Sequence, residues 1–169
     1  MGKSNKYKDK TEHYTKMIRP FMETSAWRSL SASAQALYPW IKLEWKGAKA
    51  NNNGKISLSV RQAAYKLGVT KDTAARAFHD LQAKGFLRVT EIASLGVYGQ
   101  GKCFKYEITE LPLAGKDVQS RLYNNWSEGN DFKIIKATGA NRDGKNRKPL
   151  HKYNDSPVIK FRTIRANLS

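Results

Sequence analysis

The strongest constraint in this sequence is a tight turn between two short helical segments near its centre. The first segment, residues 60–67, follows Ser59, which can cap it, and it ends at Gly68. Gly68 suits a turn that needs a positive φ angle, and a side chain at this position is expected to clash. Thr70 can cap the second segment, residues 71–84. These signals predict two helices that cross at close range.

The residues around the turn fit that prediction. Ala64 is small enough to let the helices approach, and Val69 fills the space between them. The second helix returns to a core at helical spacing through Ala74, Phe78 and Leu81. Its opposite face is polar or small and holds Lys71, Asp72, Thr73, Ala75, Arg76 and His79. Such a face fits the major groove of DNA, whereas a plain solvated face is the alternative.

The flanking segments predict a small sheet. Residues 86–92 and 103–109 have the pattern of strands, and a Gly-rich loop at 93–102 separates them. In the second strand, two sets of side chains are expected to face opposite ways: Phe104, Tyr106 and Ile108 one way, and Lys105, Glu107 and Thr109 the other. Residues 56–58 predict one further, very short strand.

The N-terminal part predicts more helix. Thr24 or Ser25 can cap a turn that places Trp27 inward, and Ser31 can cap a helix over residues 32–45. Before them, apolar residues at spacings of three and four predict a short amphipathic helix that Pro20 bends or ends: Tyr14, Met17, Ile18, Phe21 and Met22.

The charge of the chain indicates a polyanionic partner. It holds 31 Lys and Arg residues against 14 Asp and Glu, a net charge of +17. Residues 1–20 carry six basic and two acidic groups, and residues 133–169 carry ten basic and two acidic groups. Basic arms attract nucleic acid, because each cation near a phosphate releases condensed counterions. A solubilising surface is the simpler alternative.

Other function classes find little support in the sequence. Cys103 is the single cysteine, which excludes an internal disulfide. The sequence has no apolar run of about 18 residues and no secretory h-region, which predicts a cytoplasmic, nucleoid-associated protein. The histidines are too far apart for metal-ligand spacing, and no nucleophile motif or carboxylate centre stands out: His13, His79 and His151. We therefore expect no metal, no cofactor, no catalytic residue and no enzymatic activity.

One motif points toward nucleotide binding and is set aside on its context. Residues 96–102 match G-x-x-x-x-G-K, the core of a phosphate-binding P-loop. Cys103 replaces the Ser or Thr that would hold Mg²⁺, and a strand pattern follows where a P-loop needs a helix.

The stretch 52–109 resembles the winged-helix DNA-binding domains of bacterial regulators. Gly68-Val69-Thr70, Thr73 and Gly85-Phe86-Leu87 are similar to the GntR-type arrangement. That resemblance implies DNA contacts by Arg61, seven residues before the turn glycine, and by Lys71 and Thr73 after the cap. The chain departs from the family where Ala75 replaces a second Arg and Arg76 follows it, which leaves the base preference open.

A second resemblance is to small helix-turn-helix proteins of phages, plasmids and integrative elements in alphaproteobacteria. It rests on Trp27-Arg28-Ser29-Leu30 through Ala36 and on the run 52–61, and it covers roughly residues 14–111. It implies a mainly α fold with a small β-wing (α+β), a winged helix-turn-helix. Residues 1–13 would then be a flexible basic arm, residues 14–111 the DNA-binding domain, and residues 112–169 a basic tail, partly disordered or partner-docking.

The sequence thus predicts sequence-specific binding of double-stranded DNA by a transcriptional regulator of a mobile element or prophage. Arg76 can contact guanine, and Asp72 can accept from cytosine or position Arg76 or Arg61. The predicted contacts are Thr70, Lys71, Asp72, Thr73, Ala75, Arg76 and His79 on the second helix, Lys55, Ser59, Arg61 and Gln62 before the turn, and Tyr98, Gln100 and Lys102 in the wing.

Two other functions remain open on the sequence. One is a replication or recombination accessory that binds an origin or attachment site. The other is a phage-type protein that modulates a host protein through its tail, with Trp126 and residues 158–161 as contacts. A homodimer through the N-terminal helix is also compatible with the sequence, although that helix can equally cover the core.

Overall fold

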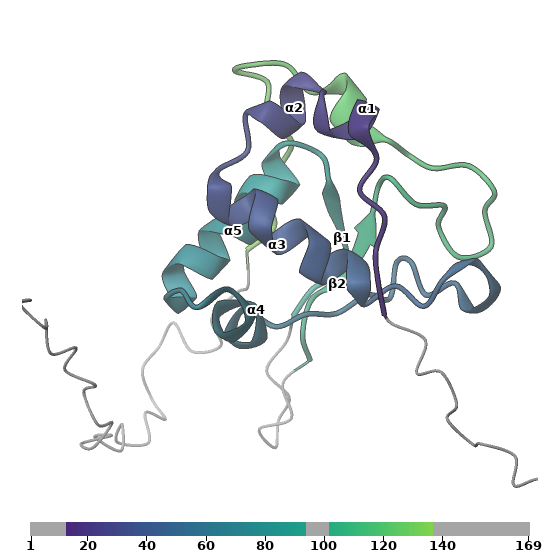
Figure 1. Cartoon of the computed structure of the whole chain (residues 1–169), viewed down its shortest axis with the longest axis horizontal. Helices are drawn as coiled ribbons and strands as arrows, with labels where there is room; N and C mark the ends of the chain where they lie inside the picture. Colours follow the sequence, from purple (N-terminus) through teal and green to yellow (C-terminus); the bar gives the residue numbers. More distant parts are fainter. Residues whose placement is uncertain (1–12, 94–101, 137–169) are drawn as a thin grey trace, which may run out of the picture. The chain divides into compact units, whose positions relative to one another are not determined.

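The computed structural model describes residues 13–93 and 102–136, and they form a mixed α+β domain (Figure 1). The predicted α+β class is therefore confirmed. Within these residues the α-helices are α1 Arg19–Met22, α2 Ser25–Arg28, α3 Ala32–Leu43, α4 Val60–Leu67 and α5 Lys71–Ala83. The strands are β1 Leu87–Glu91 and β2 Lys105–Ile108, and short 3₁₀ helices occupy Ala48–Ala50 and Leu122–Asn125.

The core lies between α3, α4 and α5. Helix α3 packs against both α4 and α5 (Figure 1). The predicted core residues of α5 are buried, since Ala74, Phe78 and Leu81 are 0–2% exposed. They meet a buried stripe on α3 that includes Leu37 and Ile41.

The predicted caps of α2 and α3 are confirmed. The hydroxyl of Ser31 accepts a hydrogen bond from the Ala34 amide at 3.3 Å at the start of α3. Thr24 accepts from the Trp27 amide at 3.2 Å at the start of α2, and Trp27 is buried. Both caps satisfy backbone amides that the helix itself leaves free.

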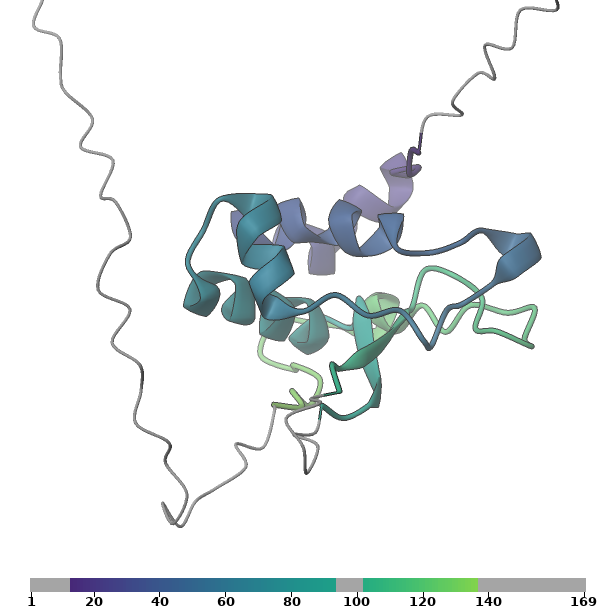
Figure 2. The same ribbon diagram turned by 90° about the horizontal axis from the view of Figure 1, so that it is seen from below.

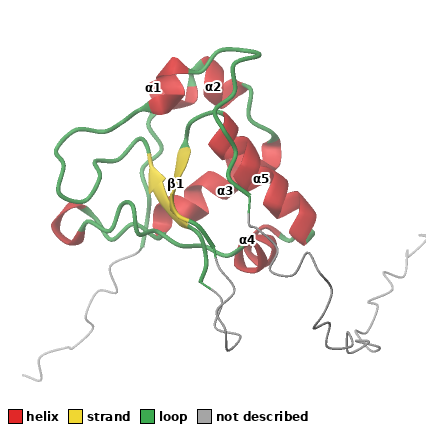
Figure 3. Ribbon diagram, turned by 180° about the vertical axis from the view of Figure 1, so that it is seen from behind, coloured by secondary structure: helices red, strands yellow, loops and turns green. Residues whose placement is uncertain are grey.

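The two strands pair antiparallel, with Leu87 opposite Ile108 and Val89 opposite Tyr106. In Figure 3 this sheet lies in front of α3 and α5. Tyr106 stacks on Phe78 of α5 with ring centroids 5.4 Å apart, which fixes the sheet against the helices. The short strand predicted at residues 56–58 is reduced to a single bridge between Ile56 and Tyr106.

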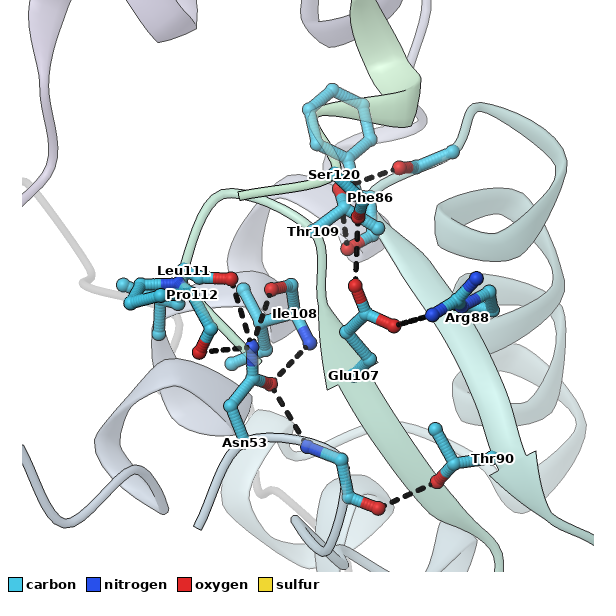
Figure 4. A network of polar contacts seen from close by, with 12 residues as sticks. Asn53, Phe86, Arg88, Thr90, Glu107, Ile108, Thr109, Leu111, Pro112 and Ser120 are labelled. Carbon is cyan, nitrogen blue, oxygen red and sulfur yellow. Dashed lines mark hydrogen bonds and ion pairs between the residues drawn. The ribbon is translucent and has the colours of Figure 1, made fainter. Parts of the chain in front are cut away.

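The face of β2 that bears Glu107 and Thr109 is buried. These two residues, predicted to face the opposite way from Tyr106 and Ile108, are 1% and 0% exposed. The segment after the sheet folds back over them. The Ser120 hydroxyl donates to Glu107 at 2.7 Å (Figure 4). The Arg121 amide donates to the Thr109 carbonyl at 2.8 Å. The alternation along the strand is correct, but both faces are covered.

Residues 112–136 belong to the folded domain, although the sequence suggested a tail that begins at residue 112. The ring of Tyr123 packs 5.1 Å from those of Phe21 and Phe86. Trp126, expected to contact a partner, is 8% exposed and donates from its indole nitrogen to Asp131 at 2.8 Å. The domain boundary therefore lies beyond this segment, and Trp126 serves the core.

A glycine allows this segment to approach. Gly85 has a φ angle of 77°, and a Cβ at this position would lie 2.8–2.9 Å from Phe132, Leu122 and Tyr123. The Phe132 amide donates to the carbonyl of Ala83 at 2.8 Å, which holds the segment along the end of α5.

The predicted N-terminal helix is wrong for residues 14–18, which are not helical. Helix α1 begins only at Arg19, with Pro20 in its first turn. Proline favours this position because its fixed φ angle suits a helix start and its missing N–H group would have no partner there. Pro20 therefore starts the helix rather than ending it, and Phe21 alone of its four residues is buried.

The loop before α4 is fixed by a buried amide. Asn53 is 1% exposed, and its side-chain nitrogen donates to the carbonyls of Ile108, Leu111 and Pro112 at 2.9–3.1 Å (Figure 4). Its side-chain oxygen accepts from the amides of Ile108 at 2.8 Å and Gly54 at 3.1 Å. This side chain therefore ties the approach to α4 to the end of β2.

Within the described residues, none of the helices has the length and apolar character that crossing a membrane requires.

Candidate nucleic-acid interface

The turn between α4 and α5 has the predicted conformation. Gly68 has a φ angle of 65° and a ψ angle of 31°, and the Val69 amide donates to the Ala64 carbonyl at 3.0 Å. The expected clash is wrong, because a Cβ at Gly68 would meet no atom within 4 Å. The position needs glycine for its backbone angle alone.

Both helices begin at the predicted caps. Ser59 and Gln62 form a reciprocal capping box: the Ser59 hydroxyl accepts from the Gln62 amide at 3.2 Å, and the Gln62 carbonyl oxygen accepts from the Ser59 amide at 3.0 Å. Thr70 accepts from the Thr73 amide at 3.2 Å, and the two Thr hydroxyls lie 2.9 Å apart. These four predicted contact residues therefore have a structural role that fixes where α4 and α5 begin.

Four of the remaining predicted residues are exposed cations that form no ion pair with a described carboxylate. Lys55, Arg61, Lys71 and Arg76 are exposed, and none forms an ion pair with a carboxylate in residues 13–93 or 102–136. We refer to these four residues, together with Tyr65, as the α4–α5 surface. Asp72 is the one acidic residue between positions 55 and 79. The surface thus carries positive charge that the described carboxylates do not neutralise.

The carboxylates elsewhere in the domain are mostly paired. Asp80 binds Lys84, Glu107 binds Arg88, and Glu110 binds Lys42. This pairing leaves Asp72 as the one carboxylate of α4 and α5 without an ion pair, so the cations of the α4–α5 surface outnumber it, and a net positive surface attracts a polyanion.

Tyr65 is a member of this surface that the sequence argument missed. It is 90% exposed and lies four residues after Arg61, so both side chains are on the same face of α4. Its position could have been found from the helical spacing, because buried Ala63 and Ala64 define the opposite face. An exposed phenol beside an Arg can donate a hydrogen bond to a phosphate.

The C-terminal half of α5 is less open than predicted. His79 is half-buried, and its pKa lies below the ordinary 6.5 because of burial and the nearby positive charge of Lys136. The amide of Ile135 donates to Gln82 at 3.0 Å, so the chain after Phe132 runs beside this part of the helix. His79 is therefore neutral near pH 7, and the first half of α5 offers the accessible surface.

The predicted wing is only partly within the described residues. Tyr98 and Gln100 lie outside them. Lys102 is exposed and lies 3.8 Å from Glu91, which also pairs with Lys105. These two lysines hold the pKa of Glu91 below its usual range, the hydrogen bond from Lys105 being the larger cause. Part of the positive charge at this end of the sheet is therefore offset by Glu91.

The relevant elements share one edge of the domain. Helix α4 lies at the lower edge in Figure 1 and faces the viewer in Figure 2. The end of the sheet at which β1 finishes and β2 begins lies at the same edge in Figures 1 and 3. As predicted, the chain after Lys102 and Cys103 forms the strand β2, whereas a P-loop would need a helix at this place.

Among residues 13–93 and 102–136, no three His, Cys, Asp or Glu side chains come together in a way that could hold a metal ion. Comparisons with protein-family models, with curated proteins and with solved structures found no match. The resemblance to winged-helix proteins therefore rests on the residues of this chain.

Proposed function

We propose that the chain is a winged helix-turn-helix protein that binds double-stranded DNA sequence-specifically, with α5 in the major groove. The observation that carries the proposal is a pair of crossing helices whose exposed cations, Arg61, Lys71 and Arg76, lack carboxylate partners among the described residues. A DNA-reading helix needs this combination of a rigid base and free basic side chains.

The first turns of α5 supply the base contacts in this proposal. Lys71, Asp72, Ala75 and Arg76 lie at spacings that bring them to one face of the helix. Arg76 can donate two hydrogen bonds to the O6 and N7 atoms of guanine, and Asp72 can accept from the amino group of cytosine. Thr70, which caps the helix, keeps its first turn in place.

Backbone contacts come from the surrounding elements. Arg61 and Tyr65 on α4 and Lys55 before it can reach phosphates on either side of the groove. The loop between β1 and β2 acts as the wing, with Lys102 at its base. These contacts position the protein and carry no sequence information.

The role that we favour is a transcriptional regulator of a mobile element or prophage. An accessory protein at an origin or attachment site would use the same surface, and the location of the bound sequence separates the two. The host-protein alternative is weaker, because Trp126 is buried in the domain and the residues 158–161 lie outside the described part.

The test is a binding titration with fragments of the surrounding genetic region and with random DNA, each at several salt concentrations. Two variants are compared: Lys71→Ala/Arg76→Ala, and a control of equal charge, Arg28→Ala/Lys116→Ala, whose two side chains are exposed and lie off α4 and α5. We expect one fragment to bind far better than random DNA, and the first variant alone to lose this preference.

Two results would overturn the proposal. One is equal binding of all DNA with a steep salt dependence and no effect of the α5 variant, which would assign binding to the basic ends of the chain. The other is an equal loss of sequence preference in both variants, which would mean that the α5 substitutions act only by lowering the net charge of the protein.

A further inference from the structure

A cavity on another side of the domain has features that the proposed DNA binding does not use. It has a volume of about 840 Å³, is partly open to solvent, and lies between α1, the end of α3 and the chain around residues 110–124. None of its lining residues belongs to α4 or α5. Its size suits one small organic molecule and is too small for a folded protein or a duplex.

The floor of the cavity is an electrically neutral network. The ammonium group of Lys42 lies 2.7 Å from a carboxylate oxygen of Glu110, and the Tyr38 hydroxyl donates to Glu110 at 2.7 Å. The same ammonium donates to the backbone carbonyl of Lys16 at 2.6 Å. Lys42 offsets the charge of Glu110, so the pair adds no net charge to the cavity.

Tyr123 lines this space, and its hydroxyl has no hydrogen-bond partner among the described residues. The side chain is 6% exposed, and its ring is stacked on Phe86. The hydroxyl forms no hydrogen bond with a described residue. Every fully buried side-chain polar atom of the described residues, however, has a hydrogen-bond partner. The hydroxyl is therefore not fully buried, and the residue lines the cavity. Burial, and secondarily Glu110, raise the pKa of Tyr123, so the hydroxyl stays protonated and can donate.

Arg121 lines the same cavity, and its backbone has a strained conformation. It is the one non-glycine residue of the described chain with a positive φ angle, 41°. Its backbone amide donates a hydrogen bond to the Thr109 carbonyl at 2.8 Å, and this bond holds the backbone in that conformation. Its guanidinium is close enough to lower the pKa of Tyr123, against the larger effect of burial, and it has no ion-pair partner in the described residues. Non-glycine residues in such conformations are concentrated at ligand sites.

The rest of the lining adds charge and an apolar wall. Lys16 and Lys46 also line the cavity without a carboxylate partner among the described residues. Ile18, Phe21 and Trp45 contribute apolar surface, and a hydrogen bond to Asn51 at 3.0 Å orients the indole of Trp45.

We propose that this cavity binds a small organic anion with an aromatic or similarly flat apolar body. The anionic group accepts hydrogen bonds from the Arg121 guanidinium and the Tyr123 hydroxyl, and the apolar body lies against Phe21 and Trp45. An anion is the ligand that fits, because the free charges among the described lining residues are positive, and the one carboxylate among them, Glu110, is paired.

The test uses the full chain labelled with ¹⁵N and titrated with 1-naphthoate, indole-3-acetate and phenyl phosphate, followed by NMR. The amides 1-naphthamide and indole-3-acetamide are the neutral controls. We expect at least one anion to shift the Trp45 indole and the Arg121 and Tyr123 amides, and its amide to bind at least about tenfold more weakly, as loss of charge-assisted hydrogen bonds implies.

Two variants remove the anion contacts with little change to the fold. Arg121→Asn keeps a residue that tolerates a positive φ angle, and Tyr123→Phe keeps the ring on Phe86. Each is expected to weaken anion binding, Arg121→Asn by about tenfold or more, whereas the distant control Arg28→Asn leaves it unchanged. If Tyr123→Phe does not fold, Arg121→Asn alone decides.

Three outcomes would overturn the proposal: no binding of any of the three anions at millimolar concentration, equal binding of an anion and its amide, or unchanged anion binding by Arg121→Asn. None of these results bears on DNA binding by α5, so this proposal and the proposed function fail independently.

Discussion

Replacing Asn53 by Ala should destabilise the domain more than its small size suggests. The side chain forms five hydrogen bonds with four residues, but most of these partners have a second bond. The Gly54 amide also donates to the Tyr106 carbonyl at 3.2 Å, and the Ile108 carbonyl also accepts from the Leu111 amide at 3.1 Å. The Pro112 carbonyl also accepts from the Asn51 side chain at 3.1 Å.

Two groups would lose their only partner among the described residues. The Ile108 amide points away from β1 into the core, where the residue is 0% exposed, and the Leu111 carbonyl is half-buried. A buried group left without a partner costs about 1–3 kcal/mol, and the half-buried carbonyl lies at the low end of that range. We therefore expect Asn53→Ala to lower the free energy of unfolding by about 2–4 kcal/mol.

The assay is urea unfolding followed by circular dichroism, with the slope of the transition compared as well as its midpoint. The matched control is Asn130→Ala, because Asn130 is exposed and its side chain makes no hydrogen bond with a described residue; it should change stability by less than about 0.5 kcal/mol. A loss below about 0.5 kcal/mol for Asn53→Ala, with an unchanged slope, would refute the reasoning on orphaned groups.

Three further predictions concern stability. Glu110→Ala should lower the free energy of unfolding in urea by about 3–5 kcal/mol, because it leaves the buried Lys42 ammonium unpaired. The double variant Lys42→Met/Glu110→Gln should recover much of that loss, and an equal loss of stability in both variants would contradict this prediction. Gly68→Ala should lower the free energy of unfolding by about 1 kcal/mol because the φ angle at this position is positive, and Gly68→Asn should lower it by less. An Ala variant as stable as the parent would contradict this prediction. Burial raises the pKa of Asp80, but hydrogen bonds from Lys84 and a backbone amide outweigh it, so the pKa lies below the ordinary 3.8. The stability contributed by Asp80 is thus present above about pH 4 and lost as the pH falls further. The free energy of unfolding of Asp80→Asn should therefore fall less steeply below about pH 4 than that of the parent, and an equal fall in both proteins would contradict this prediction.

The proposed DNA-contact surface could be predicted in part. Exposure of Lys71, Asp72 and Arg76 follows from the spacing of the buried residues on their helix. The pairing of Lys102 with Glu91 and the crowding of His79 by Lys136 could not be predicted, because each depends on a partner from another segment of the chain.

Local features of the fold were determined by the sequence itself. The caps at Ser31, Ser59 and Thr70 and the left-handed turn at Gly68 depend on hydrogen bonds and backbone angles within about four residues. A pattern of neighbouring residues is therefore enough to locate them. The alternation of β2 is local in the same sense, because successive side chains of any strand point to opposite faces.

Only the tertiary structure decided which faces are covered. Glu107 and Thr109 are buried because the chain returns over β2 after residue 112, and the aromatic ring of Tyr123 fills the space between Phe21 and Phe86. Such contacts join segments many residues apart, and their free energy depends on how the segments pack rather than on the pattern within either one. The role of Asn53 in the core was hidden for the same reason, since a turn-forming Asn and a buried one have the same neighbours in sequence.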